Sequence, residues 1–272
     1  MLGQNRLQRI ACHLWAGFKE PLRLLVTQRS LLAVLIRRDM QVRTSGTVLG
    51  GIWMLAQPAL QVLALWFLLD FVLRVRFPGQ VAFVDYFLLG MLPWLMVSEI
   101  ISRSLSVLSE FGELYQRSVF PVRVLPLLPI LFSGLVYGVV YTLIAGLLTG
   151  PAGALGAALL VLALLLWLMP LAYLMAVLGL FVRDLRQIAP FALTMILYLT
   201  PIMYMPDMLP EGLRAFLVLN PFADWMALIH AVLQDMAWSS GNLWRPLLLW
   251  LLLLASAWKL FLRSEPHIRE EL

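Results

Sequence analysis

EFGELYQRSVFPVR, residues 110–123, is the polar stretch that separates two long apolar runs and around which the remaining chain is arranged. A simple turn between two helices needs only a few residues, whereas this segment takes 14. Its mixture of opposite charges and aromatic side chains is typical of a docking surface for a partner protein. The alternative is an ordinary solvated loop. The residues expected to make the contact are Glu110, Glu113, Tyr115, Arg117, Phe120, Pro121 and Arg123.

The composition indicates a polytopic membrane protein. Of the 272 residues, 62% are hydrophobic and 13% are charged, and the mean hydropathy is +0.89. A soluble domain of this size could not bury so much apolar surface, so lipid must be the solvent for most of it. The single cysteine, Cys12, excludes an intrachain disulfide, and the three histidines lack the spacing of metal ligands. The first 20 residues lack a clean apolar core, so no removable signal peptide is expected.

The apolar runs predict an all-α integral membrane fold with six transmembrane helices. We expect the six spans at residues 48–73, 84–104, 127–148, 154–181, 188–205 and 243–262. Residues 1–47 form a basic segment whose apolar residues recur at helical spacing, too short and too charged to span the membrane. We therefore expect an amphipathic helix in the inner interface, with its arginines facing anionic headgroups. The domain prediction is this N-terminal segment, a six-span domain at 48–262 and a polar tail at 263–272.

The distribution of positive charge predicts the orientation. With six spans both termini lie on one side, and that side carries 16 of the lysines and arginines while the other carries four. The positive-inside rule then places both termini, and residues 110–123 with them, in the cytoplasm. Of the ten tryptophans, Trp94, Trp225, Trp238 and Trp244 fall near predicted span boundaries, where an aromatic belt is expected.

Charged residues at the ends of the spans are expected to form local pairs. Glu99 and Arg103 lie four residues apart near the inner end of the second span, in the favourable order for an i,i+4 pair. Asp70 and Arg74 repeat this spacing at the outer end of the first span. We interpret both as pairs that neutralise boundary charges, in preference to parts of a proton relay.

A polar stripe runs along the first span. Gln57 and Gln61 are aligned with Trp53 and adjoin an expected kink at Pro58. A polar stripe on a membrane helix faces protein or water. Two interpretations remain equally open: an interhelical hydrogen bond, and a pore wall where amides and an indole meet a polar solute.

The connection after the fifth span is too apolar for an aqueous loop. Its prolines divide residues 200–242 into pieces too short to span, which fits external re-entrant or interfacial half-helices. We expect an external gate segment at 203–240, in which residues 203–220 fold back into the outer leaflet and close the mouth of a dimeric pore. Methionine and tyrosine supply adaptable bulk and the prolines supply hinges. The gate residues are Pro201, Met203, Tyr204, Met208, Asn220 and Pro221.

Six segments in order resemble the permease subunits of type-two ABC exporters that move cell-surface polysaccharides. They are RDMQVRTSGTVLGGIWMLAQPAL (38–60), YFLLGMLPWLMVSEIISRSL (86–105), ELYQRSVFPVRVLPL (113–127), FVRDLRQIAPF (181–191), LTPIMY (199–204) and VLNPF (218–222). The branch that exports O-antigen, teichoic acid or capsule is the most similar in appearance. The resemblance covers the chain from about Arg38 to the C-terminus.

The resemblance implies a six-span permease in the inner membrane that pairs with a second copy of itself and with two copies of a cytoplasmic ABC ATPase. Residues 110–123 would be its coupling helix, and the substrate would be a lipid-linked glycan. In the family the first and fifth spans flank the channel, so the lining residues would be Trp53, Gln57, Gln61 and Tyr198. No nucleic-acid partner is expected.

No ATP site is expected on this chain. The only lysines, Lys19 and Lys259, do not follow the glycines of a phosphate-binding loop, so ATP and Mg²⁺ would be bound by the partner ATPase. Two other functions stay open at this point. One is an ABC permease for a drug or another small hydrophobic solute. The other is a membrane enzyme acting on polyprenyl-linked sugars, for which Asp224, His230 and Asp235 are the nearest approach to a catalytic group.

Overall fold

The computed structural model consists of helices joined by turns and short connections, without a strand, in the residues that it describes, which are 17–46, 50–77, 82–111, 121–236 and 243–271. In chain order, residues 17–27 are helical and α2 covers Arg29–Thr44. The first long apolar helix combines η1 (Gly50–Ile52), α3 (Trp53–Trp66) and the π-helical turn η2 (Phe67–Val72). The second is α4 (Phe83–Glu110). The remaining elements are η3 (Val122–Val124), α6 (Leu127–Ser133), η4 (Gly134–Gly138), α7 (Val139–Phe181), α8 (Asp184–Leu199), η5 (Pro206–Met208), α9 (Glu211–Leu217), α10 (Pro221–Gln234) and α11 (Trp244–Glu271).

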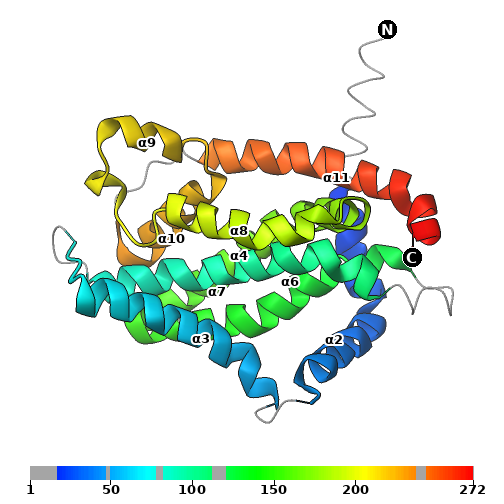
Figure 1. The fold of residues 1–272 in the computed structure, drawn as a ribbon, viewed down its shortest axis with the longest axis horizontal. Coiled ribbons are helices and arrows are strands. Elements are labelled where there is room, and N and C mark those ends of the chain that lie inside the picture. The colour runs from blue at the N-terminus through cyan, green and yellow to red at the C-terminus, as the bar shows by residue number, and fades with distance from the viewer. Residues whose placement is uncertain (1–16, 47–49, 78–81, 112–120, 237–242, 272) are drawn as a thin grey trace, which may run out of the picture.

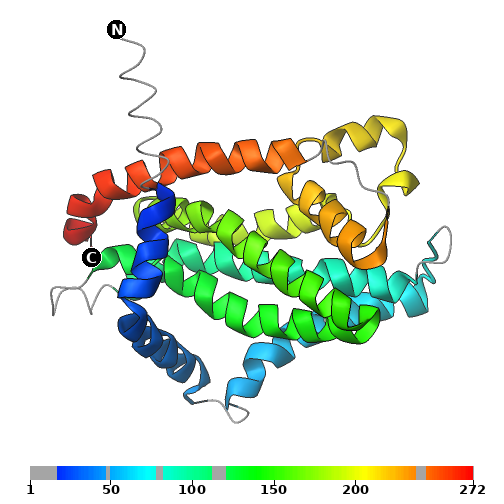
Figure 2. The same cartoon turned by 180° about the vertical axis from the view of Figure 1, so that it is seen from behind.

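Four helical stretches of the described chain are long and apolar enough to cross a membrane: Gly50–Val72, Phe83–Glu110, Val122–Phe181 and Trp244–Ile268. The third of these contains the predicted third and fourth spans, because the chain reverses at Gly150, whose φ is +81°. Its two arms run side by side (Figure 2). Glycines allow them to approach closely: a Cβ at Gly138 would lie 2.9 Å from the side chain of Val161, and one at Gly146 would lie 3.0 Å from Ala154.

The predicted fifth span is shorter in the structure than in the sequence analysis. α8 ends at Leu199 and has 16 residues, about 24 Å at 1.5 Å per residue. The prediction extended this span to residue 205, but residues 200–205 are not helical, and Pro201 together with the extended Thr200 ends the helix. The sixth span is longer than predicted, because α11 continues through the expected polar tail to Glu271.

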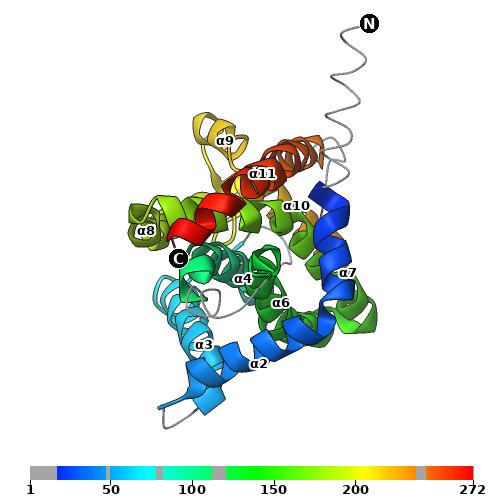
Figure 3. The ribbon, with the colours of Figure 1, turned by 90° about the vertical axis from the view of Figure 1, so that its right-hand side faces the viewer.

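α2 crosses one end of the bundle and does not continue the direction of the first long helix (Figure 3). Two left-handed glycines, Gly46 (φ +77°) and Gly50 (φ +52°), flank the connection between α2 and the first long helix. A left-handed residue without a Cβ costs little strain, which suits a sharp change of direction. This places α2 at one end of the bundle (Figure 3), and its position in a membrane interface stays a prediction.

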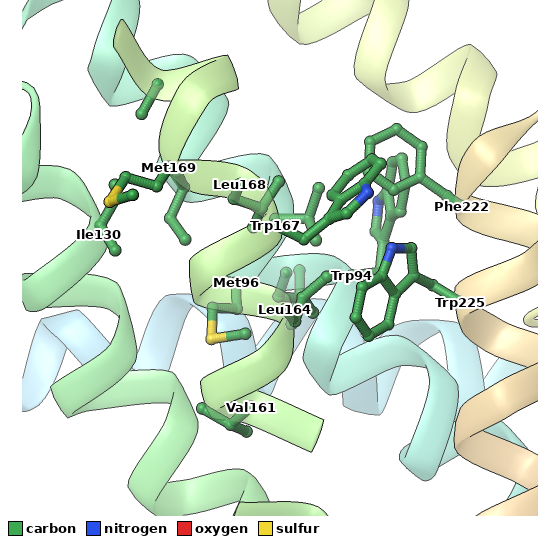
Figure 4. Packing of buried hydrophobic residues seen from close by; sticks show 14 of the residues in the cluster. Trp94, Met96, Ile130, Val161, Leu164, Trp167, Leu168, Met169, Phe222 and Trp225 are labelled. Atoms are coloured by element: carbon green, nitrogen blue, oxygen red, sulfur yellow. The ribbon is translucent and has the colours of Figure 1, made fainter. Parts of the chain in front are cut away.

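α4 is the centre of the fold. It packs against α7, α6, α8 and α10, and more than half of its residues are buried (Figure 1). An aromatic corner joins it to the outer half of the molecule (Figure 4): the rings of Trp94 and Phe222 meet edge to face at 5.4 Å, and Phe222 in turn contacts Trp167 at 5.6 Å. Trp167 also contacts Trp225 at 5.8 Å and donates a hydrogen bond of 2.8 Å to the carbonyl of Pro246.

The prediction that Trp94 and Trp225 belong to an aromatic belt is therefore wrong. They are 2% and 8% exposed, because α10 folds back onto the bundle and encloses them. Trp244 is 61% exposed at the start of α11, as a belt residue would be. Trp238 lies outside the described residues.

Candidate functional site

A polar hollow lies between the inner half of the first span and the helices behind it. Its volume is about 220 Å³, and α3 contributes Trp53, Gln57 and Gln61, the three residues that the sequence stripe singled out. The opposite wall comes from α4 and η4, which supply Ser98, Glu99, Ser102 and Tyr137, while Arg43 from α2 closes the inner end. Since the rest of the bundle surface is mainly apolar, this hollow is the place where a polar molecule would find hydrogen-bond partners at membrane depth.

The stripe residues make no interhelical hydrogen bond among the described residues, so the hydrogen-bond interpretation gains no support. Trp53 is 44% exposed, and Gln57 and Gln61 are exposed as well. The hydroxyl of Ser98, by contrast, is buried and has no hydrogen-bond partner within the described chain. A buried hydroxyl without a partner is costly, and here it belongs to a residue that lines the hollow.

An ion network joins α2 to α4 beside the hollow: Asp39 and Arg103 are buried, whereas Arg43 and Glu99 also line the hollow. The guanidinium of Arg103 donates two hydrogen bonds to the Asp39 carboxylate, 2.8 Å from Nη1 and 2.7 Å from Nη2. Arg43 reaches Glu99 at 3.1 Å and Asp39 at 3.6 Å. The ring of Phe132 lies 4.7 Å from the Arg43 guanidinium carbon and 5.1 Å from that of Arg103. The network holds α2 against α4.

Of the two predicted pairs of span charges, one is partly correct and the other is wrong. Arg103 lies 3.9 Å from Glu99, as expected, but its close partner is Asp39, which is 64 residues away in sequence and was not predicted. The prediction of an Asp70–Arg74 pair is wrong, because Asp70 forms an ion pair with Arg76 instead, with 2.8 Å between Oδ1 and Nη1. Arg74 has a φ of +50° at the turn that ends the first span, and the chain there brings the later arginine back toward Asp70.

The polar segment 110–123 is described only at its two ends. Glu113, Tyr115, Arg117 and Phe120 lie outside the described residues. At the first end, Glu110 accepts a hydrogen bond from Ser106 and lies 3.7 Å from Arg103. At the second end, after the half-buried Pro121, Arg123 forms a two-pronged ion pair with Glu265 of α11: Nη2 donates to Oε2 at 2.7 Å and Nε donates to Oε1 at 3.1 Å. Both ends of the segment thus contact the bundle, and the charge of Arg123 is neutralised within the chain by Glu265.

The end of the bundle away from α2 is held by contacts around the α8–α9 connection (Figure 1). The Tyr86 hydroxyl donates to the carbonyl of Pro201 at 3.0 Å, and Asn220 caps α10 by accepting from the Phe222 amide at 3.0 Å. Asn220 also donates to the Thr200 hydroxyl at 2.8 Å, so this predicted gate residue joins the end of α8 to the start of α10. Burial raises the pKa of the Tyr204 hydroxyl above its ordinary value.

The other predicted gate and channel residues spread over this outer surface. Met208 is 46% exposed, and Met203 is partly buried against the core. Tyr198, the predicted channel residue of the fifth span, is 51% exposed and does not join Trp53, Gln57 and Gln61 in this chain. Instead it lines an apolar hollow of about 490 Å³ together with Tyr204, Asn220 and Pro221.

The chain is similar in sequence to known membrane transport proteins. A family model described as "ABC-2 type transporter" matches residues 30–234. A protein of Klebsiella pneumoniae named O-antigen export system permease protein RfbA is 27% identical over 163 residues, which cover 58% of this chain and 62% of that protein. Another protein of that name from Klebsiella pneumoniae is 30% identical over 105 residues, 39% of each chain.

A third relative with the same name, from Myxococcus xanthus, is 32% identical over 98 residues, 36% of each chain. The matches to these curated relatives thus span less than two thirds of their length.

Proposed function

Because this chain belongs to the ABC-2 type transporter family, we propose that it is the membrane-spanning permease of an ATP-driven exporter for a lipid-linked, O-antigen-like surface polysaccharide. In this proposal it lies in the inner membrane with six spans and both termini in the cytoplasm. The observation that carries the choice of cargo is the polar hollow beside the first span, whose lining includes two amides, the Ser102 hydroxyl, an indole and the Arg43–Glu99 ion pair. These are groups that bind a sugar, whereas a permease for an apolar drug would be expected to place apolar side chains there.

A second copy of the chain would complete the pathway. The exposed apolar face of α8, including Ile188, Phe191 and Met195, and the exposed face of α3 both lack partners within the described chain. In a dimer these faces would meet each other across a central channel or face lipid. The energy would come from ATP and Mg²⁺ bound by two copies of a cytoplasmic ATPase, and this chain would bind neither.

We assign residues 110–123 to the contact with that ATPase. The support is the way the structure fastens both ends: Glu110 lies beside the Asp39–Arg103 pair, and Arg123 is fixed to Glu265. A segment held at both ends passes a displacement to α4, α2 and α11 together. Arg117→Glu should abolish export while the chain stays inserted, and Arg263→Glu on the exposed tail is the matched reversal. If reversing Glu113 and Arg117 together leaves export unchanged, this assignment is wrong.

The segment 203–220 is assigned to a gate at the external mouth. It is tied to the bundle through Tyr86 and Asn220, while α9 stands out with Leu213 and Phe216 exposed by 51% and 63%. Alanine at Tyr204 and Met208 should make resting cells leaky to small solutes, as measured by uptake of a normally excluded dye. Leu155→Ala, at an exposed position of α7, is the control. Equal uptake in all strains would count against a gate.

The proposed function is tested by reconstitution. Proteoliposomes containing this chain and its ATPase should translocate a lipid-linked glycan in an ATP-dependent way, detected by accessibility of the sugar to an added lectin. They should not accelerate the movement of a small hydrophobic dye. ATP-dependent dye transport without glycan transport would support the drug-exporter alternative and reject the proposal.

A further inference from the structure

A stacked pair of buried rings lies beside the connection between α8 and η5, at the start of the segment 203–220. The imidazole of His230 on α10 packs flat on the phenol ring of Tyr86 on α4, with 3.7 Å between the ring centroids and 5° between their planes. Both side chains are buried, with exposed fractions of 3% and 2%. The Tyr86 hydroxyl donates to the carbonyl of Pro201 at 3.0 Å and lies 3.4 Å from the carbonyl oxygen of Tyr204. The stack therefore holds Tyr86 in the position from which it fixes this connection.

The two ring nitrogens of His230 differ in their surroundings. Nδ1 lies 3.0 Å from Oε1 of Gln234, so Nδ1 carries the proton of the neutral ring and donates it to that carbonyl oxygen. Nε2 is buried and has no hydrogen-bond partner within the described chain. It faces Gly90 of α4, where an added Cβ would lie 3.4 Å from Nε2 and 3.3 Å from the side chain of Ile202. The ring thus occupies room that a side chain at residue 90 would fill, and its unprotonated nitrogen contacts hydrocarbon.

The helices around His230 offer little to balance a positive charge. α7 contains no acidic or basic residue. The titratable and charged residues at this end of α4, α10, α11 and the connection are Asp85, Tyr86, Tyr204, Asp224, Asp235 and Arg245. None of them forms an ion pair with the imidazole within the described chain, and Asp224 is paired with Arg245 at 3.4 Å. Burial therefore lowers the pKa of His230 to about 4, although the hydrogen bond to Gln234 opposes this shift.

We propose that His230 is a proton-sensitive latch on the external gate, closed while its imidazole is neutral and released when Nε2 takes up a proton. This inference rests on the proposed function, because it assumes that the segment 203–220 is the gate. A proton on Nε2 places a charge and an unsatisfied donor against Gly90, and water satisfies both only if the ring leaves Tyr86. The Tyr86 hydroxyl then loses its fixed position beside Pro201, and the connection is free to move.

The direction of the pH dependence follows from the lowered pKa of His230. The latched state favours the neutral ring, so its stability is complete above about pH 6.5 and is lost as the pH falls toward 4. Between pH 7 and pH 5 the released fraction should rise about tenfold. Because the gate lies on the external side in the proposed function, the proton would come from outside the cell.

Thiol labelling of the purified full chain, without ATPase or glycan, tests the latch. Met205→Cys places a thiol at a 6% exposed position of the connection, in a chain whose single native cysteine is removed by Cys12→Ser. Its labelling rate by a water-soluble maleimide in nanodiscs is divided by that of Leu219→Cys, a 79% exposed position, so that the pH dependence of the thiol reaction cancels. The ratio should rise about tenfold from pH 7 to pH 5. An unchanged ratio would overturn the proposal, and so would an equal rise at the buried Ala257→Cys of α11, because that would mean general unfolding.

Variants separate the proton from the stack. His230→Phe keeps an aromatic ring on Tyr86 but takes up no proton, so its ratio should stay low at both pH values. His230→Gln loses the stack as well, so its ratio should be raised but independent of pH. Tyr86→Phe removes the hydroxyl that holds Pro201 and should raise the ratio several-fold already at pH 7. His267→Phe, at an exposed position near the end of α11, is the matched control and should keep the full acid response. An acid response that survives both changes at His230 would overturn the proposal.

Failure of the latch and failure of the proposed function give different results. Glycan translocation by the complete exporter, together with a labelling ratio that does not change with pH, rejects the latch alone. A ratio that depends on pH through His230, in a chain that translocates no glycan with its ATPase, rejects the proposed function alone.

Discussion

The first and second spans are both long, apolar helices, but they are used in opposite ways. α4 buries more than half of its 28 residues against four other helices, whereas α3 buries Val62 alone and exposes Leu55, Leu60 and Leu63. The difference shows that a long apolar sequence predicts a membrane span but does not predict which surfaces that span contacts. α4 holds the fold together, and α3 presents a surface to lipid, to a second copy or to cargo. The following predictions test this division, from the largest expected effect on stability to the smallest.

The closest helix contact of α4 should be the least tolerant of change. A Cβ at Gly179 of α7 would lie 2.0 Å from the backbone carbonyl oxygen of Leu105. Because neither backbone can give way, Gly179→Val should separate the two helices and cost more than about 4 kcal/mol of unfolding free energy. We expect the variant to be absent from the folded fraction in size-exclusion chromatography.

The matched change is Gly212→Val in α9, where nothing lies within 4 Å of the added Cβ. This variant should be recovered at the level of the unaltered chain. Normal recovery of Gly179→Val as well would show that α4 is not the rigid centre of the fold.

The ion network on α4 should matter far more than the ion pair at the outer end of the first span. Asp39→Asn leaves the 7% exposed Arg103 without its bidentate carboxylate and should cost about 3–5 kcal/mol. Asp70→Asn breaks the pair with Arg76, whose side chain is 70% exposed, and should cost less than about 1 kcal/mol. Denaturation in mixed micelles measures both. Similar losses for the two variants would contradict the comparison.

The sequence predicts the elements of this fold better than their contacts. The apolar runs and Gly150 define the helices and the hairpin, because length and helix-breaking residues are local properties. Asp39 could not be predicted as the partner of Arg103, since spacing rules reach only one helical turn and these residues lie 64 apart in sequence. Trp94 and Trp225 were assigned to the boundary for the same reason: nothing local says that α10 folds back over them.

The candidate site shows the same limit. The stripe of Trp53, Gln57 and Gln61 was visible at helical spacing, and the structure brings all three to one hollow. The opposite wall was missed, since Ser98, Ser102 and Tyr137 lie on two other helices and small hydroxyl residues are common in membrane spans. A signal did exist for Ser98 and Ser102: they share the helix face of Glu99 with i,i+4 spacing.

The central claim is that the polar face of the first span serves the cargo and not the fold. The most direct measurement compares unfolding and glycan translocation for the Gln57→Leu, Gln61→Leu double variant in the reconstituted exporter. Because both side chains are exposed and make no hydrogen bond among the described residues, the unfolding free energy should change by less than about 0.5 kcal/mol. Translocation should fall roughly tenfold, as expected for two lost hydrogen bonds to the cargo. Unchanged translocation, or a loss of stability that accounts for the loss of transport, would contradict the claim.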